Sequence, residues 1–270
     1  MPKRKAVVLT DSACDLPLDL AEKNRVDIMN FEITVDGKSY TERVDFTPDQ
    51  YYDMLRSAEK VPSTAHVTMP RFLQQFTAYD DAGVEQVLYV SINATGSATN
   101  DAAVMAKEKF ATERPNSKLK IHIMDSRTYS MGYGWYVAEA ARKLNNGAEM
   151  SDVIEWLEDR FARLEIVLAA YSLRFMKKSG RISAAAAFAG ELLGLRPVIS
   201  LIDGKSVVQT KVRGDKEVLP ALMEYAEAHM DDTREYMVGG TKQENIDELA
   251  ALCKKRWKAA PMATFKLGAA

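Results

Sequence analysis

The sequence predicts an α/β protein built from two α/β domains, and three observations support this. Short apolar runs typical of buried strands alternate with amphipathic segments of helical length. Several of these runs end in a polar cluster, as strands do at the carboxyl edge of a parallel sheet. The chain has 270 residues, which is long for one domain and comfortable for two. We expect a mostly parallel sheet with flanking helices in residues 1–162 and a mixed α/β domain in residues 163–270.

The N-terminal half alternates strands and helices, which predicts right-handed βαβ units and a parallel sheet. Turn and cap residues mark several boundaries: Asp36-Gly37 is a hairpin signal, Thr47-Pro48 is suited to start a helix, and Gly147 follows a helix end. Ser151 is expected to cap the last helix. The expected strands are 6–9, 27–35, 38–41, 86–91 and 120–124; the expected helices are 16–24, one from Thr47, 71–82, 98–111, 133–145 and 151–164, with a loop over 61–70.

The C-terminal half changes in composition. A basic turn over 177–181 precedes an alanine-rich helix at 184–189. Asp203-Gly204 lies between two β-branched runs and predicts a hairpin of strands 197–202 and 206–210. The remaining expected elements are strands 165–170, 236–239 and 262–266 and helices 214–229 and 246–258.

Composition excludes several classes of protein. Lys plus Arg (36) nearly balances Asp plus Glu (38), which argues against a nucleic-acid binder. The two cysteines, Cys14 and Cys253, are expected to be free thiols, and three histidines do not suggest a metal site. The apolar run near the N-terminus is too short for a signal peptide or a membrane span, so a cytoplasmic location is expected.

The strongest functional signal is a loop of hydroxyls around a glycine, directly after the strand at 86–91. A helix is expected to start just beyond it, and helix N-termini offer backbone N–H groups to anions. The loop therefore predicts a site that holds an oxygen-bearing head group. Polar residues after other strands and in a neighbouring loop are expected to line the same crevice. The residues concerned are Asn93, Thr95, Gly96, Ser97, Asp11, Ser12, Asp125, Ser126 and Thr64.

Two other interpretations of these residues stay open. Asp11 and Asp125 are residues that commonly cap a turn or helix through the carboxylate. An enzyme, a hydrolase or phosphotransferase acting on a small oxyanion through the Thr95-Gly96-Ser97 loop, is the alternative function. Its nucleophile would be Ser12, Ser97 or Ser126 and would need a base such as His66. No nucleophile elbow or phosphate-binding loop occurs, and Gly132-Tyr133-Gly134 lacks the third glycine of a dinucleotide fingerprint.

Taken together, nine segments resemble the DegV family, whose members include the fatty-acid-binding (FakB-type) subunit of bacterial fatty acid kinase. The resemblance covers nearly the whole chain, and its specificity comes from the order and spacing of the segments. They are Thr10–Pro17, Pro62–His66, Ser91–Ser97, Met124–Arg127, Gly132–Gly134, Lys177–Ser183, Leu195–Ile199, Asp203–Lys205 and Lys211–Arg213.

The resemblance implies a two-domain carrier that buries one long-chain fatty acid. It places the acyl carboxylate at Thr64 and at Thr95, with Gly96 and Ser97 beside it. A family histidine near the carboxyl terminus corresponds to Lys266, and a lysine can also pair with a carboxylate. Ala65 and His66 stand where the family has serine and glutamine.

The resemblance further implies that the protein is not itself an enzyme and needs no cofactor or metal. A separate fatty acid kinase would be the partner, and contact with membranes would be only transient. Lys177, Arg181 and Arg196 are candidates for the partner-facing surface; a solvated basic turn is the simpler interpretation of the first two. A lipid-responsive interaction protein that works without any kinase is a third hypothesis.

Overall fold

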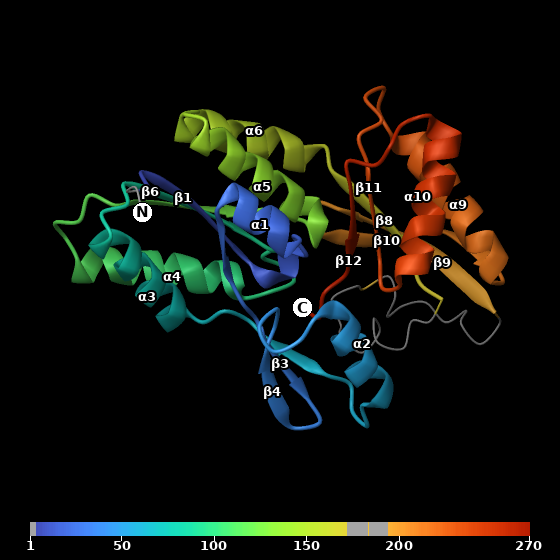
Figure 1. Ribbon diagram of the computed structural model, residues 1–270, viewed down its shortest axis with the longest axis horizontal. Helices are drawn as coiled ribbons and strands as arrows, with labels where there is room; N and C mark the ends of the chain where they lie inside the picture. The colour runs from blue at the N-terminus through green and yellow to red at the C-terminus, as the bar shows by residue number, and fades with distance from the viewer. Residues whose placement is uncertain (1–3, 172–182, 184–193) are drawn as a thin grey trace.

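The computed structural model describes residues 4–171, 183 and 194–270 (Figure 1). Its largest sheet is parallel, with strand order β2-β1-β6-β7, and it confirms the predicted α/β class. Strand β1 has neighbours on both sides, so the crevice expected for a ligand lies at the carboxyl ends of β1 and β6. The four strands are β1 (Ala6–Asp11), β2 (Val26–Met29), β6 (Gln86–Ser91) and β7 (Lys120–Asp125).

Helices cover both faces of this sheet, as its apolar strands require (Figure 1). All residues of β1 and β6 except the first of each are buried. One face carries α1 (Leu18–Asn24), α5 (Met131–Asn145) and α6 (Met150–Ala162). The other carries α3 (Met69–Asp81) and α4 (Thr99–Glu113).

Packing in the core accounts for the glycines of the Gly132-Tyr133-Gly134 segment, with no need for a bound dinucleotide. A Cβ at Gly134 would lie 2.2 Å from the carbonyl oxygen of Cys14, so only glycine lets α5 approach the end of β1 this closely. The neighbouring Tyr133 is fully buried. The motif therefore serves packing.

After β2 the chain enters a small antiparallel sheet with strand order β4-β3-β5. The single strand predicted over 27–35 is wrong: the chain leaves the parallel sheet at Asn30 and Phe31, and the Phe31 amide donates to the Ser12 hydroxyl. The region predicted as a loop, residues 61–70, contains a strand of three residues. All three are exposed, so the sequence shows no apolar alternation from which this strand could be predicted. The elements are β3 (Glu32–Val35), β4 (Lys38–Thr41), β5 (Ser63–Ala65) and α2 (Pro48–Ser57).

Two predicted helix caps gave different outcomes. Thr47 caps α2 in a reciprocal capping box with Gln50, as the sequence predicted. The cap predicted at Ser151 is wrong, because α6 starts one residue earlier, with Glu149 at the N-cap position. The Ser151 hydroxyl instead donates to Asp152.

The C-terminal half holds an antiparallel sheet of order β10-β9-β8 and a separate parallel pair, β11 and β12. The predicted hairpin is confirmed, and the helix predicted at 184–189 lies outside the described residues. The boundary at 162 falls between α6 and β8 and stays a prediction. The elements are β8 (Glu165–Ala169), β9 (Leu195–Ile202), β10 (Lys205–Arg213), α9 (Val218–His229), β11 (Met237–Gly240), α10 (Gln243–Trp257) and β12 (Ala263–Lys266).

The end of the chain returns to the N-terminal half. Phe265 and Ala269 pack against the core cluster built around the parallel sheet. Figure 1 shows the C-terminus near the centre of the molecule, close to α1 and α2. In the part of the chain that the structure describes, no helix is both long and apolar enough to cross a membrane.

Candidate functional site

The hydroxyl loop lies where the sequence predicted it, between β6 and α4. The amides of residues 93–96 all donate hydrogen bonds: to the Thr128 carbonyl (3.0 Å), the Asp125 carboxylate (3.0 Å), the Asn93 side chain (3.2 Å) and the Asn93 carbonyl (3.0 Å). These bonds fix the backbone, so the loop presents its side chains without needing to fold around a ligand.

The two hydroxyls of the loop differ in their partners. Thr95 is exposed, and its hydroxyl donates to Asn93 Oδ1 at 3.1 Å. The Ser97 hydroxyl pairs with that of Thr99 at 2.8 Å, at the start of α4. Both are neutral groups that can donate to or accept from an oxygen-bearing ligand after a simple rotation.

The loop also touches residues that sequence reasoning missed. Asn93 Nδ2 donates to the Tyr129 hydroxyl at 2.7 Å and to the Gly204 carbonyl at 3.4 Å, so the β9–β10 hairpin meets the loop. A Cβ at Gly96 would lie 2.6 Å from the Tyr129 hydroxyl, which explains the glycine. Gly204 lies in the segment Asp203–Lys205, which contributes to the family resemblance, but no local pattern links it to residue 93.

Asp11 is fully buried at the carboxyl end of β1, beside β6. Its carboxylate accepts from the hydroxyls of Tyr133 (2.6 Å) and Tyr89 (2.9 Å) and from the Ile92 amide (3.0 Å). Burial raises the pKa of Asp11 to about 6, although these donors stabilise the ionised form. With these bonds the group holds the sheet and α5 together.

The remaining predicted polar residues of the strand ends hold local structure. Ser12 is buried and donates to Glu42 at 2.5 Å. Asp125 accepts from the amides of Ala94 and Arg127, and buried Ser126 bonds within its own turn, to Thr128. Ser12 thus contacts the residue that follows β4, Asp125 contacts the loop that follows β6, and Ser126 stays within its own turn.

Two acidic side chains missed by sequence reasoning, Asp15 and Glu42, bind the end of the chain. Asp15 accepts from the Gly268 amide at 2.7 Å and from the Ser130 hydroxyl at 2.5 Å. Glu42, which is 2% exposed, accepts from the amides of Ala269 (2.6 Å) and Ala270 (3.0 Å). Burial raises the pKa of Asp15 to about 7, and the nearby Glu42 charge adds to the rise.

Lys266 directly precedes this segment and lies across the same junction. Its ammonium contacts both carboxylate oxygens of Asp49, near the start of α2, at 2.6 Å each. Thr64 lies on β5, opposite Ile33, and is exposed together with His66.

The predicted partner surface is described only in part. Arg196 Nε donates to Asp215 at 2.9 Å. Lys177 and Arg181 lie outside the described residues.

The structure joins the hydroxyl loop to the Lys266 segment through one turn. Tyr129 in this turn contacts Asn93, and the adjacent Ser130 contacts Asp15, which binds Gly268. The loop, the turn and the end of the chain therefore form one hydrogen-bonded group at the junction of the two halves.

The serines proposed as nucleophiles have other partners. Ser12 bonds to Glu42, Ser97 to Thr99 and Ser126 to Thr128. Across the described ranges, no group of three or more histidine, cysteine, aspartate or glutamate residues is arranged to hold a metal ion. The arrangement is suited to binding an oxygen-bearing group.

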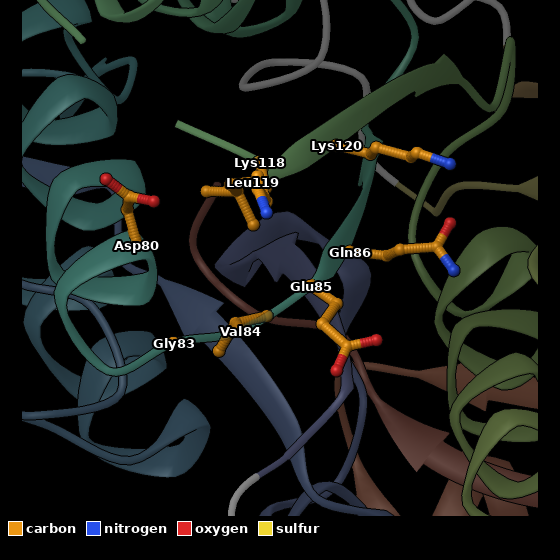
Figure 2. Close-up of a pocket in the computed structure, with 8 residues that line it drawn as sticks. All are labelled: Asp80, Gly83, Val84, Glu85, Gln86, Lys118, Leu119 and Lys120. Carbon is orange, nitrogen blue, oxygen red and sulfur yellow. The ribbon is translucent and has the colours of Figure 1, made fainter. Parts of the chain in front are cut away.

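Two cavities lie at the opposite end of the parallel strands. One, of about 480 Å³, is lined by Asp80, residues 83–86 and residues 118–120 (Figure 2). The other, of about 530 Å³, adjoins Lys120, His122 and α6. Both lie where β6 and β7 begin, roughly 16 Å from the ends of these strands. They are separate from the hydroxyl loop.

Comparison with known proteins places this architecture in a family. A sequence profile of DegV, an uncharacterised protein family, matches residues 5–270. The chain belongs to the DegV family. A DegV domain-containing protein of Caldanaerobacter subterraneus is 28% identical over 250 residues, covering 92% of this chain and 86% of the relative. One from Clostridium perfringens is 30% identical over 217 residues, covering 80% of this chain and 75% of the relative.

Solved structures of other proteins share the fold of this chain. A stearic acid-binding protein from Eubacterium ventriosum aligns with a TM-score of 0.88 at 23% identity, over 98% of this chain and 92% of that one. A fatty acid-binding DegV family protein from Streptococcus agalactiae aligns with a TM-score of 0.84 at 26% identity, over 98% of this chain and 93% of that one. The family resemblance predicted from the sequence is confirmed.

Proposed function

We propose that this protein binds one long-chain fatty acid and holds its carboxylate at the hydroxyl loop. The observation that carries the proposal is the prebuilt Asn93–Ser97 loop at the carboxyl edge of β6, in a chain that shares its fold with fatty acid-binding DegV proteins over 98% of its length. Thr95 is the exposed hydroxyl of that loop, and Lys266 and Thr64 are the further head-group residues that the family resemblance implies.

Energetics are consistent with a carrier. Burying about 14 methylenes at about 0.8 kcal/mol each gives roughly 11 kcal/mol before the cost of association is subtracted. A buried carboxylate costs several kcal/mol when it lacks partners. Hydroxyl donors and one ammonium offset that cost, because hydrogen bonds to a charged group are the strong ones.

We further propose that the bound carboxylate is presented to a separate, ATP-dependent fatty acid kinase, which forms the acyl phosphate. Neutral hydroxyls suit this role, since they hold a carboxylate oxygen without reacting with it. Arg196 is the described member of the proposed partner surface. Acyl phosphate formation by such a kinase with ATP, measured with and without this protein, tests the step; equal rates would contradict it.

Native mass spectrometry followed by lipid extraction tests the binding itself. We expect a stoichiometric mass excess that extracts as a fatty acid. Thr95→Ala is expected to weaken oleate binding about tenfold, because one hydrogen bond to a charged group is lost. Thr112→Ala, an exposed threonine on α4, is the matched control and should bind normally.

Two outcomes would contradict the carrier. A protein at its bare sequence mass that also takes up no oleate does not bind fatty acids. Turnover of a small oxyanion that Ser97→Ala abolishes without loss of the ligand would favour the hydrolase or phosphotransferase.

A further inference from the structure

The last residues of the described chain, 267–270, form a strap that crosses from β12 to the N-terminal half. Their hydrogen bonds are made by the backbone: three successive amides donate to Asp15 and Glu42, and the carbonyls of Leu267 and Gly268 accept from the Tyr52 hydroxyl at 3.2 and 3.4 Å. Two carboxylates and a hydroxyl therefore fix the path of the chain directly after Lys266.

The hydrogen bonds described for these two carboxylates go to the strap and to serine hydroxyls of the N-terminal half. Glu42 follows β4 and is also bonded by Ser12, while Asp15 follows the short 3-10 turn Ser12–Cys14 and is also bonded by Ser130. Each carboxylate is thus held by one N-terminal hydroxyl and holds the strap with its other oxygen. Hydrogen bonds from three successive amides therefore attach the strap to the N-terminal half.

The fit of the strap depends on Gly268. A Cβ at this residue would lie 2.6 Å from Asp15 Oδ1 and 2.8 Å from Glu42 Oε1. Real Cβ atoms do not approach so closely, so an alanine here must move the strap or both acids. Either response disturbs the contact between the strap and these two carboxylates.

We propose that Asp15 and Glu42 are positioning residues that, through the strap, set the place of the Lys266 ammonium for the acyl carboxylate. The proposal rests on the function proposed above. Lys266 is also held by Asp49, but an ammonium has three donors, so it can bind a second carboxylate while keeping that contact. The acids act on the ligand only through Lys266.

A comparison of oleate with oleyl alcohol tests the proposal, because the two share a chain and only oleate carries a carboxylate. Affinities are measured by calorimetry on delipidated full-length protein. Lys266→Met is expected to lower the oleate-to-alcohol affinity ratio about tenfold. Gly268→Ala is expected to lower it to a similar extent, and the double variant no further, since the two changes remove the same contact.

Two controls separate positioning from loss of stability. Gly147→Ala strains a left-handed residue after α5 with no neighbour within 4 Å of the added Cβ, so it destabilises the fold away from the strap and should leave the ratio unchanged. Tyr52→Phe removes only the hydroxyl bonds to the strap and should lower the ratio less than Gly268→Ala. It also supplies the test where Gly268→Ala fails to fold.

The failures are distinguishable. A wild type that binds neither oleate nor oleyl alcohol contradicts the proposed function. A wild type that binds both, with a ratio that Lys266→Met leaves unchanged, overturns the positioning role. Additive effects of Lys266→Met and Gly268→Ala overturn it too, as does a ratio that falls in Lys266→Met but in neither strap variant.

Discussion

Carboxylates near the carboxyl end of β1 form two groups that connect different parts of the chain. The first group is Asp11 alone, and the second is Asp15 with Glu42. Asp11 bonds to Tyr89, Ile92 and Tyr133, all within the parallel sheet and the helix that covers it. Asp15 bonds to Gly268, 253 residues away, and Glu42 holds the next two amides. The first group joins the layers of one half, and the second ties the end of the chain to that half. Loss of the first should therefore weaken global folding, and loss of the second should free a local segment.

The largest expected effect is at Asp11. Asp11→Ala leaves two tyrosine hydroxyls and one amide buried without their acceptor, so we expect the free energy of unfolding to fall by about 3–4 kcal/mol. Urea denaturation followed by circular dichroism measures it. Asp11→Asn is the control, because its amide can accept from Tyr89 and Ile92 and donate to Tyr133, and it should cost only about 1 kcal/mol. An alanine variant as stable as the asparagine one would refute the role of Asp11 in joining the layers.

A smaller effect is expected from pH at Asp15. Its pKa is about 7 in the folded chain against an ordinary 3.8, so the folded chain binds this proton more tightly than the unfolded chain does. Stability from this group is present at low pH and is lost as the pH rises through 7. The groups that face Asp15 are Glu42, whose charge raises its pKa, and Arg43, whose charge lowers it, together with Cys14 and Tyr52.

We expect the free energy of unfolding of the wild type to fall by about 2 kcal/mol from pH 5 to pH 8 through Asp15, allowing for its partial exposure. Asp11, with a pKa of about 6, adds a decline that is complete at a lower pH. Urea midpoints at constant ionic strength measure the profile. Asp15→Asn should remove the part of the decline between pH 6 and 8. A variant profile that matches the wild type would contradict a raised pKa at Asp15.

The two regions also differ in how far the sequence predicts them. The strand at 86–91 was predictable because both faces of a parallel sheet bury apolar side chains, which leaves a continuous apolar run. The hydroxyl loop was predictable because it follows such a run. The strap was not, since it makes its contacts through backbone amides that any residue carries. Glu42 is a single acid in a polar stretch, and only the folded chain shows what it binds.

The smallest effect is expected at the contact between Asp49 and Lys266, which crosses the same junction as the strap. The Asp49 side chain is 67% exposed, and solvent-exposed ion pairs contribute about 0.5 kcal/mol, less in high salt. Asp49→Asn should therefore shift the urea midpoint only slightly in low salt. In 1 M salt it should not shift the midpoint at all, because the screening length there is about 3 Å. A salt-independent loss above about 1.5 kcal/mol would instead mean that this pair holds the end of the chain as the buried carboxylates do. The attachment of residues 267–270 would then depend on Asp49 as well as on Asp15 and Glu42.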